Sequence, residues 1–239
     1  MKFNMAIIAT IVLLGTLTSG MAQAFNVDKM VIVADKKGNG LVTLTNDGQS
    51  PIFVKSQVQE IKVDSNNNIQ RTEYKRSNLS DWKISVTHSK MVLKPGEEKD
   101  VGIRSLCHNT SCDDSKDLMF MLPFTPSKYK EREGSKNGVE INYGFTPIYI
   151  IPTTHPVYDF KIYNQGETLR VNNESNTMIN VFVDTCSDQN KSNCKQKFTA
   201  IAGRDKTFNL PKELQSKSIN VTISSYDKSY SENDTLIKE

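Results

Sequence analysis

Residues 139–152 read Val139-Glu140-Ile141-Asn142-Tyr143-Gly144-Phe145-Thr146-Pro147-Ile148-Tyr149-Ile150-Ile151-Pro152. In the first half of this stretch, apolar and aromatic residues occupy every second position: Val139, Ile141, Tyr143 and Phe145. Such alternation is typical of a β-strand with one buried face. A charged run over residues 128–138 precedes it. At the edge of a sandwich, a strand of this kind can lend its apolar face to the unfinished core of another protein.

Short strands separated by turn residues are also predicted before this stretch. We expect them over residues 25–34, 41–46, 52–61, 82–93, 101–103 and 118–124. The last of these is almost wholly apolar, which predicts a central strand that is buried on both faces. About seven strands with turn signals at this spacing indicate an immunoglobulin-like β-sandwich.

The pattern changes after Pro152. The sequence Thr153-Thr154-His155-Pro156 predicts a hinge, and short strands resume beyond it as far as residue 225. No helical pattern of useful length follows the first 24 residues. We therefore expect an all-β protein with two immunoglobulin-like β-sandwich domains joined by a short hinge. The N-terminal domain is predicted over residues 25–152 and a smaller C-terminal domain over residues 153–239.

The first residues predict export from the cytoplasm. A short apolar run over residues 6–17 precedes Ala22-Gln23-Ala24, which has the small-x-small form of a signal-peptidase site. We interpret residues 1–24 as a cleaved signal peptide, because the apolar run is too short to span a bilayer comfortably. The mature chain is not expected to be membrane-embedded. A formal net charge of +3 also gives no indication of a nucleic-acid partner.

The four cysteines lie in two close pairs, Cys107 with Cys112 and Cys186 with Cys194. In an exported chain, close even pairs predict two local disulfides. The alternative is a metal site that uses Cys107, His108 and Cys112. It lacks a fourth ligand at a recognisable spacing, so we favour the disulfides and expect no metal.

Catalytic motifs are lacking in the sequence. The three histidines, His88, His108 and His155, do not have the spacing of a zinc site or a catalytic triad. No nucleophile elbow, P-loop or dinucleotide fingerprint is present. We therefore expect neither an enzyme nor a cofactor.

Together these features resemble the periplasmic chaperones of the chaperone/usher pilus pathway. The sequence Leu93-Lys94-Pro95-Gly96 is similar to the Leu-x-Pro-Gly turn of that family, and Ile103-Arg104 stands where the family often has an arginine. Residues 137–152 look like its seventh strand and terminal proline. The pair Cys186 and Cys194, with Phe198 after it, resembles the alternative branch of the family. The resemblance covers most of the mature chain.

The resemblance implies a function. Chaperones of this family donate their seventh strand to a pilus subunit whose sandwich lacks its last strand, and they deliver it to an outer-membrane usher. By this resemblance Val139, Ile141, Tyr143 and Phe145 insert into the subunit's groove. The same alternation would also suit a strand that faces this protein's own core. The implied location is the periplasm, the implied partners are pilus subunits and the usher, and an exposed donor strand could also mediate self-association.

Members of the common branch hold the subunit's C-terminal carboxylate with an arginine on the first strand and a lysine on the seventh. Here the seventh-strand position falls near Pro147, which is uncharged. Lys29 is the first candidate for a replacement, because it has the same parity as the apolar residues of the first strand. On an apolar face its charged side chain needs an oppositely charged partner or a water-filled cleft, unless it reaches solvent from the end of the strand. Arg104 and Lys55 are secondary candidates.

Two other functions are compatible with two exported sandwiches. One is a secreted or surface adhesion protein, which has no need of the charged loop and the alternating strand after it. The other is a pilus subunit, which usually comprises one incomplete domain. The C-terminal residues 235–239 also lack an aromatic-ended closing strand.

Overall fold

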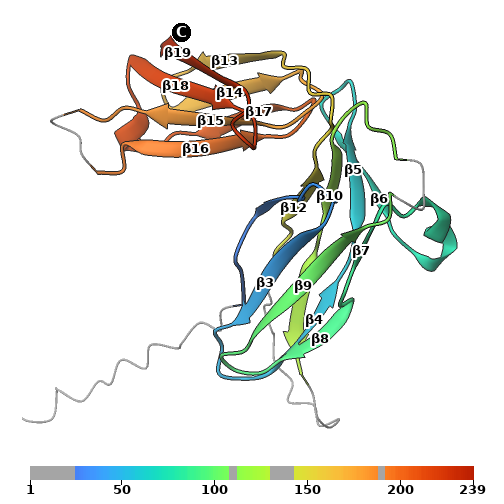
Figure 1. Cartoon of the computed structure of the whole chain (residues 1–239). Helices are drawn as coiled ribbons and strands as arrows, with labels where there is room; N and C mark the ends of the chain where they lie inside the picture. The colour runs from blue at the N-terminus through green and yellow to red at the C-terminus, as the bar shows by residue number, and fades with distance from the viewer. Residues whose placement is uncertain (1–24, 108–111, 130–142, 188–191) are drawn as a thin grey trace, which may run out of the picture.

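The computed structural model describes residues 25–107, 112–129, 143–187 and 192–239. Its strands form two β-sandwiches, and in Figure 1 the second (orange to red) lies across one end of the first (blue to green). The predicted signal peptide, most of the charged loop, and Val139 and Ile141 lie outside the described residues. Within the described part of the chain, neither helix is long and apolar enough to cross a membrane.

The first sandwich consists of three sheets that share one core. Its elements are β1 (Phe25–Val27), β2 (Val31–Val33), β3 (Gly40–Asn46), β4 (Ile52–Ser56), β5 (Gln59–Val63), β6 (Ile69–Glu73), the 3-10 helix η1 (Arg76–Asp81), β7 (Ile84–Val86), β8 (Lys90–Leu93), β9 (Glu98–Ser105), β10 (Leu118–Met121), β11 (Phe124–Lys128) and β12 (Ile148–Ile151). The strand orders are β1-β3-β9-β7, β2-β12-β10-β5-β6 and β11-β4-β8. Side chains from all three sheets meet in one apolar cluster.

Four of the predicted strands are each divided between two sheets. The predicted strand over residues 25–34 forms β1 in the first sheet and β2 in the second, and residues 52–61 form β4 and β5 in different sheets. Residues 82–93 and 118–124 are divided in the same way. Strands that switch sheets make the corners of a sandwich. The prediction of continuous strands is therefore wrong at these corners, although the predicted β structure is present on either side of them.

The predicted central strand is present as β10. It pairs with β12 on one side and with β5 on the other. Opposite Phe120 lies Tyr149 of β12, which is fully buried and donates a 2.6 Å hydrogen bond from its hydroxyl to the carbonyl of Gly38. This bond satisfies the polar end of a large side chain in the centre of the core.

The second sandwich contains two sheets. Its elements are β13 (Phe160–Asn164), β14 (Thr168–Asn173), β15 (Ile179–Asp184), β16 (Lys195–Ala200), β17 (Asp205–Asn209), the 3-10 helix η2 (Lys212–Leu214), β18 (Ser218–Ser224) and β19 (Ser231–Ile237). The orders β13-β14-β17 and β16-β15-β18-β19 enclose a separate apolar core. The C-terminal residues thus form the strand β19, although the sequence predicts strands only as far as residue 225.

A third apolar cluster lies where the two sandwiches meet. Ile61, Met119 and Ile150 come from the first sandwich, and Met178, Ile201 and Ala202 come from the second. The connecting residues 152–159 pass beside this cluster. The predicted hinge sequence therefore lies at a packed joint.

Candidate functional site

The segment that leads into β12 is the described end of the predicted donor strand. It runs along β10 and β11, because the amide of Leu122 donates to the carbonyl of Pro147 at 2.9 Å. Further on, Phe124 and Phe145 exchange two backbone hydrogen bonds of 2.8 and 3.1 Å. Residues 145–151 therefore form one extended run, in which Pro147 contributes no amide donor.

Gly144 allows this segment to lie close to β11. A Cβ atom built on Gly144 would lie 2.7 Å from the carbonyl oxygen of Phe124. Real Cβ atoms are not found so close to a backbone oxygen, so a larger residue would push the segment away. The glycine in the alternating pattern thus has a packing role.

The structure places the two described groove-filling candidates differently. The ring of Phe145 packs on this protein's own core, with its centroid 5.8 Å from that of Phe25. Tyr143 is 77% exposed. Phe145 therefore fits the alternative that the alternating residues face this protein's own core. The side chain of Tyr143, in contrast, is available to another molecule. The assignments of Val139 and Ile141 stay predictions, because both residues lie outside the described part of the chain.

Other exposed apolar side chains lie beside β12. Met30, which is 51% exposed, accepts a 2.9 Å backbone hydrogen bond from Ile148. Val31, the first residue of β2, is also exposed and pairs in parallel with Ile148. The chain crosses from the first sheet to the second over residues 28–30, and β1 pairs with β3. Exposed apolar residues at a strand edge are a typical feature of a protein-binding surface.

The three candidate anchors occupy separate places. Lys29 lies between β1 and β2, where its side chain is about half exposed and pairs with Asp28 at 3.1 Å. Its expected parity with the apolar residues of the first strand is wrong, because the strand switches sheets at this point and the buried residues beyond it are Ile32 and Ala34. Lys55 lies on β4 opposite Lys90, and Arg104 lies on β9 opposite Ser85. Their assignment as anchors stays a prediction.

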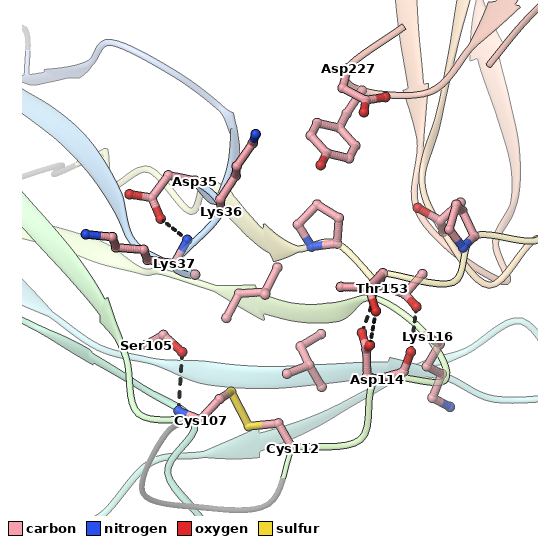
Figure 2. Close-up of a pocket in the computed structure, with 18 of the residues that line it drawn as sticks. Asp35, Lys36, Lys37, Ser105, Cys107, Cys112, Asp114, Lys116, Thr153 and Asp227 are labelled. Atoms are coloured by element: carbon pink, nitrogen blue, oxygen red, sulfur yellow. Dashed lines mark hydrogen bonds between the residues drawn. A yellow bond between two sulfur atoms is a disulfide. The ribbon is translucent and has the colours of Figure 1, made fainter. Parts of the chain in front are cut away.

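A cleft of about 700 Å³ lies between the two sandwiches (Figure 2). The loop between β2 and β3 supplies Lys36 and Lys37 on one side, and the loop between β18 and β19 supplies Tyr226 and Asp227 on the other. Figure 2 shows Lys36 and Asp227 on different sides of the cleft. The residues that line this cleft do not include Lys29, Lys55 or Arg104.

The sequence Lys36-Lys37-Gly38-Asn39-Gly40 predicts no more than a turn, because it combines two glycines with polar residues. The turn is present, with the amide of Gly38 donating to the carbonyl of Asp35 at 2.9 Å. The pairing of β2 with β12 carries it to the joint, because β12 leads directly into the connecting residues. Two adjacent lysines in a turn were the only indication in the sequence that this turn could bind a carboxylate. The strand pairing is what places them beside the second sandwich.

Three aspartates of the cleft and the joint have shifted pKa values. Hydrogen bonds from Thr154 lower the pKa of Asp114 below its ordinary value. Burial raises the pKa of Asp117, against the effect of the amides of Thr153 and Met178 that donate to it. Hydrogen bonds from Ser225 and Ser229 lower the pKa of Asp227 to about 2. At neutral pH, Asp227 therefore presents a carboxylate to the cleft opposite Lys36.

Both cysteine pairs form disulfides. Cys107 is bonded to Cys112, with 5.4 Å between the Cα atoms, and Cys186 is bonded to Cys194, with 5.0 Å between them. The first disulfide lies in the wall of the cleft (Figure 2). The second lies in the second sandwich, where Cys186 follows β15 and Cys194 precedes β16. These bonds engage both sulfurs of the alternative metal site.

Several solved structures resemble this chain. A chain of the Salmonella enterica SafA pilin–SafB chaperone complex is 12% identical, with a TM-score of 0.53 over 90% of this chain and 97% of that one. A chain of the CsuC–CsuE chaperone–tip adhesion subunit complex from Acinetobacter baumannii is 14% identical, with a TM-score of 0.51 over 90% and 99% of the two chains. The class 5 fimbriae chaperone CfaA is 12% identical, with a TM-score of 0.50 over 90% and 100%. At these identities the likeness shows a shared two-sandwich fold.

Among curated proteins, none matches the sequence significantly. A family model does match it, the CS5 fimbrial protein N-terminal domain, over residues 27–152. The match includes every strand of the first sandwich except the first two residues of β1. Because it spans more than half of the 239 residues, the protein belongs to the CS5 fimbrial protein N-terminal domain family.

Proposed function

We propose that this protein is a periplasmic chaperone that binds fimbrial subunits by donating strand residues 139–147 and delivers them to an outer-membrane usher. The observation that carries this proposal is the segment before β12, which β11 holds on one side and whose first described residue, Tyr143, is exposed. The shared fold with chains from structures titled as fimbrial chaperones supports it. The proposal describes binding and delivery, and it requires no catalysis.

The binding mode follows from strand chemistry. A subunit strand that pairs with the donor segment gains main-chain hydrogen bonds, and alternate side chains enter its groove. Burying the side chain of Tyr143 or Met30 against a subunit would contribute roughly 1.5–3 kcal/mol for each residue that becomes fully buried. Because Phe145 is already packed on the chaperone's own core, we assign groove filling to Tyr143 and the residues before it. Phe145 then fixes the base of the donor segment.

The cleft supplies a candidate for the carboxylate anchor. A slip of one residue would turn every donor side chain to the wrong face, so an anchor at a fixed position sets the register. Lys36 is exposed but lines the cleft between the two sandwiches, whereas Lys29, which is also exposed, does not line it and pairs with Asp28. We therefore place Lys36 before Lys29, Arg104 and Lys55 as the residue that binds the subunit's C-terminal carboxylate.

The proposed location is the periplasm, reached through the predicted signal peptide over residues 1–24. Two disulfides in the described residues support an oxidising compartment. An exposed donor edge is also compatible with self-association of the free chaperone. Domain boundaries after residues 24 and 152 remain part of the proposal.

Co-purification tests the proposed function. The tagged full-length protein is expressed in its own host, isolated from the periplasm, and the bound chains are identified by mass spectrometry. We expect a fimbrial subunit in a one-to-one complex. Incorporation of the tagged protein into fibres would instead indicate a pilus subunit. A tagged protein that is found on the cell surface without a bound subunit would indicate an adhesion protein.

Two charge reversals test the anchor. Lys36→Glu should lower the yield of bound subunit by about tenfold, since roughly 1.4 kcal/mol of lost affinity has this effect. Lys29→Glu is the matched control and should leave the yield near that of the wild type. The opposite ranking would restore Lys29 as the anchor.

A further inference from the structure

Residues 112–117 form a segment that we call the clasp. It begins at Cys112, whose disulfide with Cys107 fixes it to the end of β9, and it leads directly into β10 at Leu118. Cys107 itself is held in the first sandwich, where its amide donates to the hydroxyl of Ser105 at 3.2 Å. The adjacent amide of Leu106 donates to the carbonyl of Lys83 at 2.8 Å. Both ends of the clasp are therefore attached to the first sandwich.

The clasp binds the residues that connect the two sandwiches. The carboxylate of Asp114 accepts hydrogen bonds from both the amide (3.0 Å) and the hydroxyl of Thr154, and its carbonyl accepts one from the hydroxyl of Thr153 at 2.5 Å. The amide of Thr153 donates to Asp117 at 3.0 Å. Figure 2 shows Asp114 directly beside Thr153, with the disulfide at the base of the same segment. The connecting residues are thus held by side chains that lie close in sequence to Cys112.

The clasp also binds the second sandwich directly. The other carboxylate oxygen of Asp117, which is 2% exposed, accepts a 2.8 Å hydrogen bond from the amide of Met178. The amide of Asp117 donates to the carbonyl of Asn176 at 2.9 Å. The side chain of Asn176 donates to the carbonyls of Ser115 (2.8 Å) and His155 (2.9 Å). One short segment therefore contacts the first sandwich, the connecting residues and the second sandwich at the same time.

A second set of contacts joins the β5–β6 hairpin to the second sandwich through Asn67, Arg204 and Asp205, which are separate from the residues of the clasp. Asn67, at the tip of the β5–β6 hairpin, donates from its side chain to the carbonyl of Asp205 at 2.9 Å and accepts from the amide of Asp205 at 3.0 Å. The guanidinium of Arg204 donates to the carbonyl of Asn67. The apolar packing at the joint is non-directional, so with it and these contacts alone the second sandwich could still rotate about the hairpin tip. Two separate sets of contacts remove that freedom.

We propose that the clasp sets the angle between the two sandwiches and that the Cys107–Cys112 disulfide is its anchor. The proposed role of this disulfide is to position Asp114 and Asp117 against the second sandwich, in addition to closing a short loop. Cys186–Cys194 closes a short loop between two strands of one sheet, and the hydrogen bonds described for Cys186 and Cys194 stay within the second sandwich. It should therefore have no effect on the angle. This proposal concerns the free protein and does not depend on the proposed function.

Backbone residual dipolar couplings of the full mature protein test the proposal. In the wild type, we expect the couplings of both sandwiches to fit a single alignment tensor. In Cys107→Ser/Cys112→Ser, the couplings of the second sandwich should shrink relative to those of the first, because the sandwiches then align separately. The matched control Cys186→Ser/Cys194→Ser should retain the single tensor.

A second set of variants keeps the test valid if removal of the disulfide impairs folding. Thr154→Val and Asp117→Asn preserve side-chain volume and remove hydrogen bonds of the clasp, and each should weaken the common alignment. Retention of the single tensor in the folded disulfide variant, or in both polar variants, would overturn the proposal. Because these measurements use the free protein, their failure leaves the co-purification test of chaperone function unaffected.

Discussion

Residues 143–147, the described part of the proposed donor segment, and the clasp over residues 112–117 both border β10 and β12, but they differ in how their polar and apolar groups are satisfied. The described residues of the proposed donor segment make few backbone bonds to the sandwich and include an exposed Tyr143. The clasp has its carboxylates, amides and carbonyls paired with three parts of the molecule. Unused apolar surface marks a place for a partner, whereas satisfied buried polar groups mark a place where the geometry is fixed. The first sandwich therefore has an open side at residues 143–147, where apolar surface is exposed, and a closed side at the clasp, where polar groups are paired within the protein.

The largest expected effect on stability is at the closed side. Asp117→Ala removes the acceptor of two buried amides, and each unsatisfied donor costs about 1–3 kcal/mol, so we expect a loss of roughly 2–6 kcal/mol. Urea unfolding measures it. Trp82 is the only tryptophan, and it lies in the first sandwich, so its fluorescence reports that sandwich while circular dichroism reports both. A loss below about 0.5 kcal/mol, the range of ordinary surface changes, would show that the clasp is not structurally important.

Gly144→Val tests the base of the open side. The added side chain meets the carbonyl of Phe124, and overpacking of this kind costs about 1–3 kcal/mol. We expect the segment to move off β11 and the amide of Phe145 to exchange faster with solvent. Thr146→Val is the control, because it places a similar side chain two residues further on. Unchanged exchange at Phe145 in Gly144→Val would mean that the close approach is not required.

Tyr143→Asp should affect binding and leave stability nearly unchanged. Its side chain is exposed in the free protein, so the free energy of unfolding should change by less than about 0.5 kcal/mol. In a complex, an unpaired carboxylate would enter an apolar groove, and the loss of bound subunit should be several-fold or more. Asn142→Asp, the neighbouring position of opposite parity, serves as the control. Normal subunit yield from folded Tyr143→Asp protein would exclude Tyr143 from the donor face.

The smallest expected effect is a difference between the titration midpoints of two carboxylates of the clasp, Asp114 and Asp117. Asp114 has a lowered pKa, so its contribution to stability is present above the ordinary aspartate value of 3.8 and is lost as the pH falls through the lowered value. Asp117 has a raised pKa, so its protonated form favours folding, and this contribution is lost as the pH rises above 3.8. Carboxyl NMR titration should therefore give midpoints on opposite sides of 3.8. Equal midpoints would contradict the difference in burial.

Local patterns were sufficient where neighbours in sequence are neighbours in space. The turn after Leu93 is present, with Gly96 at a φ of +70°, a backbone conformation that glycine adopts without a steric penalty. Both close cysteine pairs form disulfides. The position of Lys36 and the contacts of Asp117 were not predicted, because they join segments far apart in the chain.

The sequence by itself determined the β class, the two sandwiches, the cysteine pairing and the apolar alternation of the donor segment, because each depends on residue type and short spacing. Only the tertiary structure decided whether an alternating apolar residue packs on this protein's own core or is left exposed for a partner. Alternation defines two faces of a strand, but it carries no information on where the strand leaves one sheet for another. Phe145 and Tyr143 share a parity, yet one packs on the protein's own core and the other is exposed. That difference arises from where the segment runs relative to β1 and β11, which is set by pairing between distant strands.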